Sequence, residues 1–289
     1  MRHIQHPGAV SAQRMQVVAA TTHQIELELA AGRSLLEAVR LALLPLGASS
    51  AVLSLRDGSF FPFAYALPAL SKTPEHAVYF SDRFDAAQPV RLECATVTYG
   101  QRDGQAWLHC HAAWTQSDGT RCCGHVLPEH AFVSGRVRAS ACLLDGARFE
   151  VQPDEETHFS LFQPEAATTS STSASDRTSL AVRLAPNEDV CSAVEAICRE
   201  YGITQANIHG GVGSTVGAVF EDGHAVEPFV TEVLIRSGQV VCGSDGAPRA
   251  QIDVSLVDFC GGVHHGRLLR GANPVLVTFE LVLAPQGAS

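Results

Sequence analysis

The chain has 289 residues, 46% of them hydrophobic, and a formal net charge of −10. This length suggests one to three domains with a sizeable core. The acidic balance argues against a polyanionic partner such as DNA, because affinity for phosphates depends on Lys and Arg. No apolar run approaches the roughly 18 residues that a membrane span needs, and the N-terminus lacks a signal-peptide pattern. We therefore expect a cytoplasmic protein without a membrane partner.

The first predicted elements are a strand and a helix. Residues 25–29 are apolar at every second position, which is typical of a strand, and residues 35–43 are apolar at helical spacing. Pro45 and Gly47 then end the helix. The rest of the first half is predicted to be mostly strand, with turns at Asp57–Gly58, Asp118–Gly119 and Asp145–Gly146.

A second copy of this pattern follows a Ser, Thr and Ala-rich segment at residues 163–179, which we interpret as a flexible linker. Residues 180–184 alternate as a strand, and a helix is predicted after them with Asn187 as its N-cap. We expect an α+β protein of two similar domains, each a mostly antiparallel sheet with one main helix. The predicted boundaries are an N-terminal extension at 1–20, a first domain at 21–162, the linker at 163–179 and a second domain at 180–285.

Three histidines of the first half are the strongest chemical signal. His109 and His111 lie two residues apart in a predicted strand, so they project from the same face. A hairpin at Asp118–Gly119 would return the chain and bring His125 beside them. Three imidazoles with one open position for water is the arrangement of a catalytic zinc site. Paired histidines on a half-exposed strand also occur without any chemical role, and the spacing alone leaves both interpretations open.

The segment LHCHAAWTQSDGTRCCGHVLPEHAFVSG, residues 108–135, resembles the core signature of the plants-and-prokaryotes-conserved (PPC) domain. GGVGSTVGAV at residues 210–219 and TFELVL at residues 278–283 are similar to other parts of that family. The resemblance covers nearly all of both halves, so the chain looks like a tandem, diverged pair of PPC domains. It implies a compact α+β fold, assembly as a homo-oligomer, usually a trimer, and a metal ion, zinc or another divalent metal, on the three histidines.

The second half departs from the first at the histidine positions. Asp253 and Ser255 stand where the two strand histidines would be, and His264 and His265 roughly match the third. We interpret this remnant as a degenerate site. Glu280 alternates with apolar neighbours, and the sequence leaves open whether it is an inward carboxylate that orients a histidine or an exposed strand residue.

The second half also supplies candidate substrate-binding residues. Gly211, Gly213 and Ser214 lie in the glycine-rich stretch, where the backbone can turn tightly or approach a ligand. His264, His265, Arg267 and Arg270 are the other substrate-binding candidates, and the two arginines could hold a carboxylate or simply face solvent. Because each half retains what the other has lost, a composite site between domains or between subunits is a reasonable hypothesis.

The function predicted from these residues is a metal-dependent enzyme, with zinc as the expected metal. It would act on a small carboxylate-bearing metabolite by hydrolysis, hydration, lyase or deamination chemistry. The sequence names no catalytic residue. One alternative is a non-catalytic ligand-binding or assembly module. The other is a PPC-type DNA-binding regulator, which the acidic charge and the lack of an AT-hook disfavour, so that nucleic acid is expected to be an unlikely partner.

Overall fold

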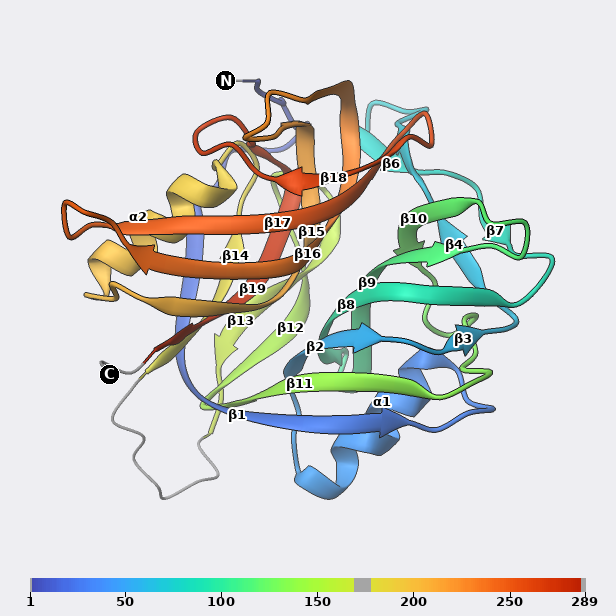
Figure 1. Ribbon diagram of the computed structural model, residues 1–289. Coiled ribbons are helices and arrows are strands. Elements are labelled where there is room, and N and C mark those ends of the chain that lie inside the picture. Colours follow the sequence, from blue (N-terminus) through green and yellow to red (C-terminus); the bar gives the residue numbers. More distant parts are fainter. Residues whose placement is uncertain (1, 169–177, 287–289) are drawn as a thin grey trace.

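The computed structural model describes residues 2–168 and 178–286 and is shown in Figure 1. Strands dominate the described part of the chain. Its α-helices are α1 (Leu35–Leu43) and α2 (Val190–Glu200), and a short 3-10 helix (Leu44–Leu46) follows α1. Neither α-helix has the length and apolar character needed to cross a membrane. The mostly antiparallel sheet with few helices confirms the predicted fold class at this coarse level.

The strands fall into two sequence halves. Those of the first half are β1 (Met15–Leu29), β2 (Ala51–Arg56), β3 (Ser59–Phe60), β4 (Ala64–Ala66), β5 (Pro68–Leu70), β6 (Val78–Phe80), β7 (Phe84–Asp85), β8 (Val90–Arg102), β9 (Gln105–Thr115), β10 (Arg121–Val126), β11 (Val137–Asp145), β12 (Ala147–Pro153) and β13 (Ser160–Ala166). Those of the second are β14 (Ser179–Leu184), β15 (Ala206–Val219), β16 (Ala225–Cys242), β17 (Pro248–Asp258), β18 (Val263–Arg267) and β19 (Val275–Pro285).

The main sheets of the two halves have the same strand order. Neighbouring strands run β1–β11–β2–β8–β9–β10 in the first half, and every pair is antiparallel. They run β14–β19–β15–β16–β17–β18 in the second half, again antiparallel throughout. In each half the helix follows the first strand of this order. The strand–helix pattern that recurs in the sequence therefore marks a recurring topology.

Strand β1 is shared by both sheets. Its residues 15–20 pair with β14, and its residues 21–29 pair with β11. In Figure 1 this long strand runs along the base of the molecule and turns upward into the other half. The sequence analysis placed residues 1–20 in an N-terminal extension, but residues 15–20 are strand. Residues 15–20 form a strand because they pair with β14, and β14 is too distant in sequence for a local pattern to predict this pairing.

Two local predictions differ from the structure. Residues 163–166, predicted as the start of the linker, continue β13 because they pair with β12, and residues 169–177 lie outside the described residues. The N-cap of α2 is Asp189, whose side chain accepts a hydrogen bond from the Ser192 backbone N–H at 2.8 Å. Asn187, the predicted cap, has a φ of 68° and bonds the backbone of Ile4 instead.

Each helix covers one face of its own sheet, and the opposite faces of the two sheets meet. Leu53 and Leu55 of β2 belong to the core beneath α1. Val52, which precedes Leu53, points the other way and packs with Ala181 and Val282 of the second half. This alternation follows from the two-residue period of a strand. The surface between the sheets is therefore lined by residues from both halves.

Candidate metal centre between the two halves

Strand alternation directs His109 and His111 toward the second half. Their neighbours Leu108, Cys110 and Ala112 on β9 are buried in the core beneath α1. The two histidines lie on the other face, where the sheets meet, and their ring centroids are 4.7 Å apart. The predicted placement on one face agrees with this geometry.

The chain returns from β9 into β10 through a turn in which Gly119 has a φ of 87°. This conformation is open to glycine at little cost. His125 on β10 then pairs directly opposite His111. Its ring centroid lies 5.2 Å from that of His109 and 5.3 Å from that of His111. The structure therefore brings the three predicted histidines together.

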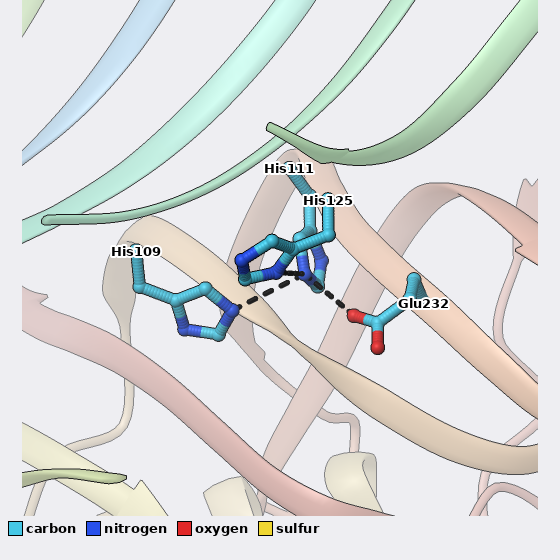
Figure 2. Close-up of side chains that lie close together, drawn as sticks. All are labelled: His109, His111, His125 and Glu232. Carbon is cyan, nitrogen blue, oxygen red and sulfur yellow. Dashed lines mark hydrogen bonds and ion pairs between the residues drawn. The ribbon is translucent and has the colours of Figure 1, made fainter. Parts of the chain in front are cut away.

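The second half adds a carboxylate to these imidazoles. Oε2 of Glu232, on β16, lies 2.5 Å from Nε2 of His111. One ligand atom from each of His109, His111, His125 and Glu232 lies within 4.8 Å of the others, and Figure 2 shows the three rings gathered beside the carboxylate. Sequence reasoning missed Glu232, since no local motif marks it and its neighbours come from the other half.

Hydrogen bonds at the far side of two rings fix their tautomers. Nδ1 of His111 donates to the Val233 carbonyl at 2.8 Å, and a carbonyl can only accept. Nδ1 of His109 donates to the Glu280 carboxylate at 3.0 Å. In each neutral ring Nε2 therefore carries a lone pair, and these two Nε2 atoms face each other at 3.1 Å.

Glu280 is thus the inward carboxylate that the sequence left as one of two alternatives. It lies on β19 and is 0% exposed. Its neighbours Phe279 and Leu281 point into the core beneath α2, so alternation turns Glu280 toward the first half. A carboxylate that accepts the outer N–H of a histidine is the usual support of a metal-binding imidazole.

The cluster shifts the pKa values of its histidines in opposite directions. Burial lowers the pKa of His109, but the Glu280 carboxylate opposes this and leaves that pKa above its usual value. Burial, followed by repulsion from His109 and His111, holds the pKa of His125 well below its usual value. His125 is therefore neutral at physiological pH, which is the form that binds metals.

The spacing of the ligand atoms suits a cation at the centre of the cluster. Nε2 of His111 lies 3.1 Å from Nε2 of His109, 3.2 Å from Nδ1 of His125 and 2.5 Å from the Glu232 carboxylate. A proton on that nitrogen would satisfy one of these acceptors well and leave the other lone pairs facing one another. A metal ion would satisfy all four ligands at once.

The centre lies in the wall of a cavity of about 490 Å³ between the two halves. The cavity is lined by His109, His125, Glu232 and Glu280. Of the candidate substrate-binding residues, Gly213 and Ser214 also line it. The glycine-rich stretch therefore reaches the same space as the histidines.

The other candidate substrate-binding residues do not line this cavity. Gly211 has a φ of 105° and packs against Ile235, so its role is conformational. Arg267 pairs with Asp253 at 3.0 Å, and Arg270 pairs with Glu195 at 2.7 Å. These arginines act in local ion pairs and do not reach the site.

The paired histidines His264 and His265 lie on β18, and neither lines the cavity. Strand register matches His111 and His125 of the first half to Ser255 and His265 of the second. His264 bonds Asp258 and His224 instead. Within the described ranges 2–168 and 178–286, the His109 cluster is the one group with metal-binding geometry.

Comparison with known proteins shows which family the second half resembles. Residues 171–285 match the model of the Plants and Prokaryotes Conserved (PCC) domain, also written PPC. The second half of the chain is therefore similar to the PCC domain. The resemblance inferred from the sequence is confirmed by this match. A search of curated proteins found no significant match.

Several solved structures resemble parts of the chain. A metal-containing protein from Archaeoglobus fulgidus is 18% identical, with a TM-score of 0.41, over 48% of this chain and 92% of its own. A PPC protein from Pyrococcus horikoshii is 13% identical, with a TM-score of 0.40, over 55% and 100%. A protein from Bacteroides thetaiotaomicron, described as a candidate DNA-binding protein, is 14% identical, with a TM-score of 0.38, over 50% and 96%.

The comparisons overturn the predicted function. The sequence favoured a zinc-dependent hydrolase or lyase with a small-molecule substrate, and treated nucleic acid as an unlikely partner. The matches are to the PCC domain and to structures that include candidate DNA-binding proteins, so both predictions are wrong. The net-charge argument was insufficient because net charge averages over the whole surface, whereas phosphate binding depends on the local arrangement of cations. The trimer and the domain boundaries stay predictions.

Proposed function

We propose that this protein is a non-catalytic metal- and ligand-binding module built from two PCC-type halves, with one divalent metal ion held by His109, His111, His125 and Glu232. The observation that carries the proposal is the convergence of four ligand atoms within 4.8 Å of one another. The fixed tautomers of His109 and His111 support it, since they aim two lone pairs at the same point.

The position of Glu232 favours a metal-binding role over a catalytic role for this centre. Metal sites with four protein ligands are typically structural, whereas catalytic sites keep one position for water or substrate. Glu232 lies where the sequence analysis left a fourth position for water, 2.5 Å from His111. A closed site of this kind stabilises an arrangement of the chain and does not activate a water molecule.

Zinc is the first candidate for the ion. Imidazole and carboxylate ligands bind zinc at about 2.0–2.2 Å in a tetrahedron, which places neighbouring ligand atoms about 3.4 Å apart. The nitrogen pairs of the cluster are 3.1 and 3.2 Å apart, so small movements would suffice. Cobalt and nickel also accept such ligands, and the ligand set alone does not separate them from zinc.

Metal analysis of the purified full chain tests the proposal. We expect one equivalent of divalent metal per chain by mass spectrometry, retained on gel filtration and removed by a chelator. His111→Ala should reduce the metal content to below a tenth of an equivalent. His23→Ala is the matched control, because His23 is exposed on β1 and far in register from the cluster. Absence of tight metal binding in the unmodified chain would refute the proposal.

DNA binding is the second candidate function, because the PCC match brings with it relatives described as candidate DNA-binding proteins. The chain carries 20 Lys and Arg residues, of which Lys72 is the single lysine, so phosphate contacts would depend on arginine. Fluorescence anisotropy with a labelled duplex tests this candidate. We expect the affinity for the duplex to fall steeply as the salt concentration rises from about 50 to about 200 mM, because phosphate contacts release counterions. No binding at the lower salt concentration would remove the candidate.

A further inference from the structure

We infer that the cavity between the two halves binds an anion with a flat aromatic body, and that Arg102 holds its anionic group. This inference rests on the proposed function, because the metal centre forms part of the cavity wall. The cavity volume of about 490 Å³ lies within the range of roughly 300–1,000 Å³ that is usual for small-ligand sites.

Aromatic side chains form part of the cavity wall, and Trp107 is the one that lies beside Arg102. Trp107, Phe159 and Phe162 line it, and Trp107 and Phe159 keep part of their surface exposed. Phe159 also stacks on Tyr79 at a centroid distance of 5.7 Å, which fixes the orientation of its ring. Covering such rings with a flat apolar body removes apolar surface from water and adds ring–ring contact.

Arg102 is the available cation of the cavity. Its guanidinium lies 5.4 Å from the centre of the Trp107 ring, and within the described residues it makes no hydrogen bond or ion pair. The other lining arginine, Arg83, is already paired with Asp85 at 2.6 Å. Arginine stacked on an aromatic ring still offers its N–H groups in a fork that matches a carboxylate or phosphate.

The acidic groups of the cavity set the direction in which an anion binds. Glu232 and Glu280 lie in the wall at the metal centre and are engaged by His111 and His109. Glu129 also lines the cavity and is exposed. Glu232 and Glu280 together offset the charge of a divalent ion at the centre, so the centre offers an anion no net positive charge, and Glu129 repels it. The anionic group of the ligand therefore faces Arg102, and the apolar body of the ligand lies along the aromatic wall.

This ligand chemistry has two possible sources, an aromatic carboxylic acid and a nucleotide. Calorimetry on the metal-loaded full chain separates them with three probes: 2-naphthoate, its neutral analogue 2-naphthamide, and adenosine monophosphate. We expect an anionic probe to bind at least tenfold more tightly than 2-naphthamide. Preference for naphthoate assigns the carboxylic acid, and preference for the nucleotide assigns the nucleotide.

Arg102→Gln should abolish the preference for the anion and leave the weak binding of 2-naphthamide unchanged. Arg91→Gln is the control, because Arg91 is an exposed arginine on the same strand, β8, outside the cavity. Equal affinity for charged and neutral probes, or equal losses in both variants, would overturn the inference.

Metal content, measured on the same samples, separates the two proposals. A chain that holds one metal ion but binds none of the probes contradicts the cavity inference and leaves the metal centre intact. A chain without metal that still binds an anion through Arg102 supports the cavity inference and refutes the metal centre.

Discussion

His111 on β9 and Glu232 on β16 approach to 2.5 Å, and through this contact the first half of the chain meets the second. The first half supplies every imidazole of the centre, and the second half supplies the carboxylates Glu232 and Glu280. Neither half contains the complete ligand set. A metal ion at this position would therefore tie the two sheets together.

Replacing Glu232 by Gln should weaken metal affinity at least tenfold, because a neutral amide is a poorer ligand than a carboxylate. Competition with a chromophoric chelator measures the change. Glu227→Gln is a control on the same strand, since Glu227 is exposed and pairs with Arg2 at the surface. Equal affinities in the two variants would show that Glu232 is not a ligand.

Replacing Glu280 by Gln should lower metal affinity by about 10- to 100-fold, the usual effect of losing a carboxylate behind a metal-binding imidazole. Gln preserves the size of this fully buried side chain, and circular dichroism should confirm that the fold is unchanged. The stoichiometry should remain one ion per chain. A lost equivalent of metal at saturation would instead indicate that Glu280 itself is a ligand.

Metal should raise the melting temperature of the chain. An ion that binds the folded state alone contributes about 2.7 kcal/mol at a free concentration 100 times its dissociation constant. Thermal unfolding across a series of buffered free-metal concentrations measures this effect. His111→Ala should unfold at a temperature that does not depend on metal, and a parallel rise in that variant would place the stabilising ion elsewhere.

Asp154→Asn should destabilise the fold by about 3–5 kcal/mol, because it leaves a buried cation unpaired. Asp154 bonds Arg183 at 2.8 Å, and Arg183 is 2% exposed. Urea unfolding measures the loss. Asp57→Asn, which breaks an exposed pair with Arg138, should cost less than about 1 kcal/mol. Similar losses in both variants would contradict the assignment.

The same pair predicts an acid-sensitive stability. Burial raises the pKa of Asp154, but Arg183 and the Thr157 hydrogen bonds lower it more, so its folded pKa lies below the usual value of 3.8. The pair stabilises the fold fully above that value, and this contribution is lost as the pH falls through the folded pKa. Asp154→Asn should lack this part of the acid dependence, and an unchanged profile would show that other carboxylates control it.

Local patterns in the sequence predicted a large part of the fold. Alternation identified the strands at residues 25–29 and 180–184, and helical spacing identified α1 and α2, because both periods are set by backbone geometry. The His-x-His spacing and the turn at Asp118–Gly119 were sufficient to predict that three imidazoles converge, since a hairpin is a local structure.

The sequence by itself determined the strand–helix repeat, the common face of His109 and His111, and the return of His125 through a hairpin. The tertiary structure alone decided that Glu232 lies beside His111 and that Glu280 contacts Nδ1 of His109. Glu232 lies 121 residues from His111 along the chain, and Glu280 lies 171 residues from His109. Periodicity reports which face of a strand a residue occupies, but the partner of that face is set by how the two sheets pack.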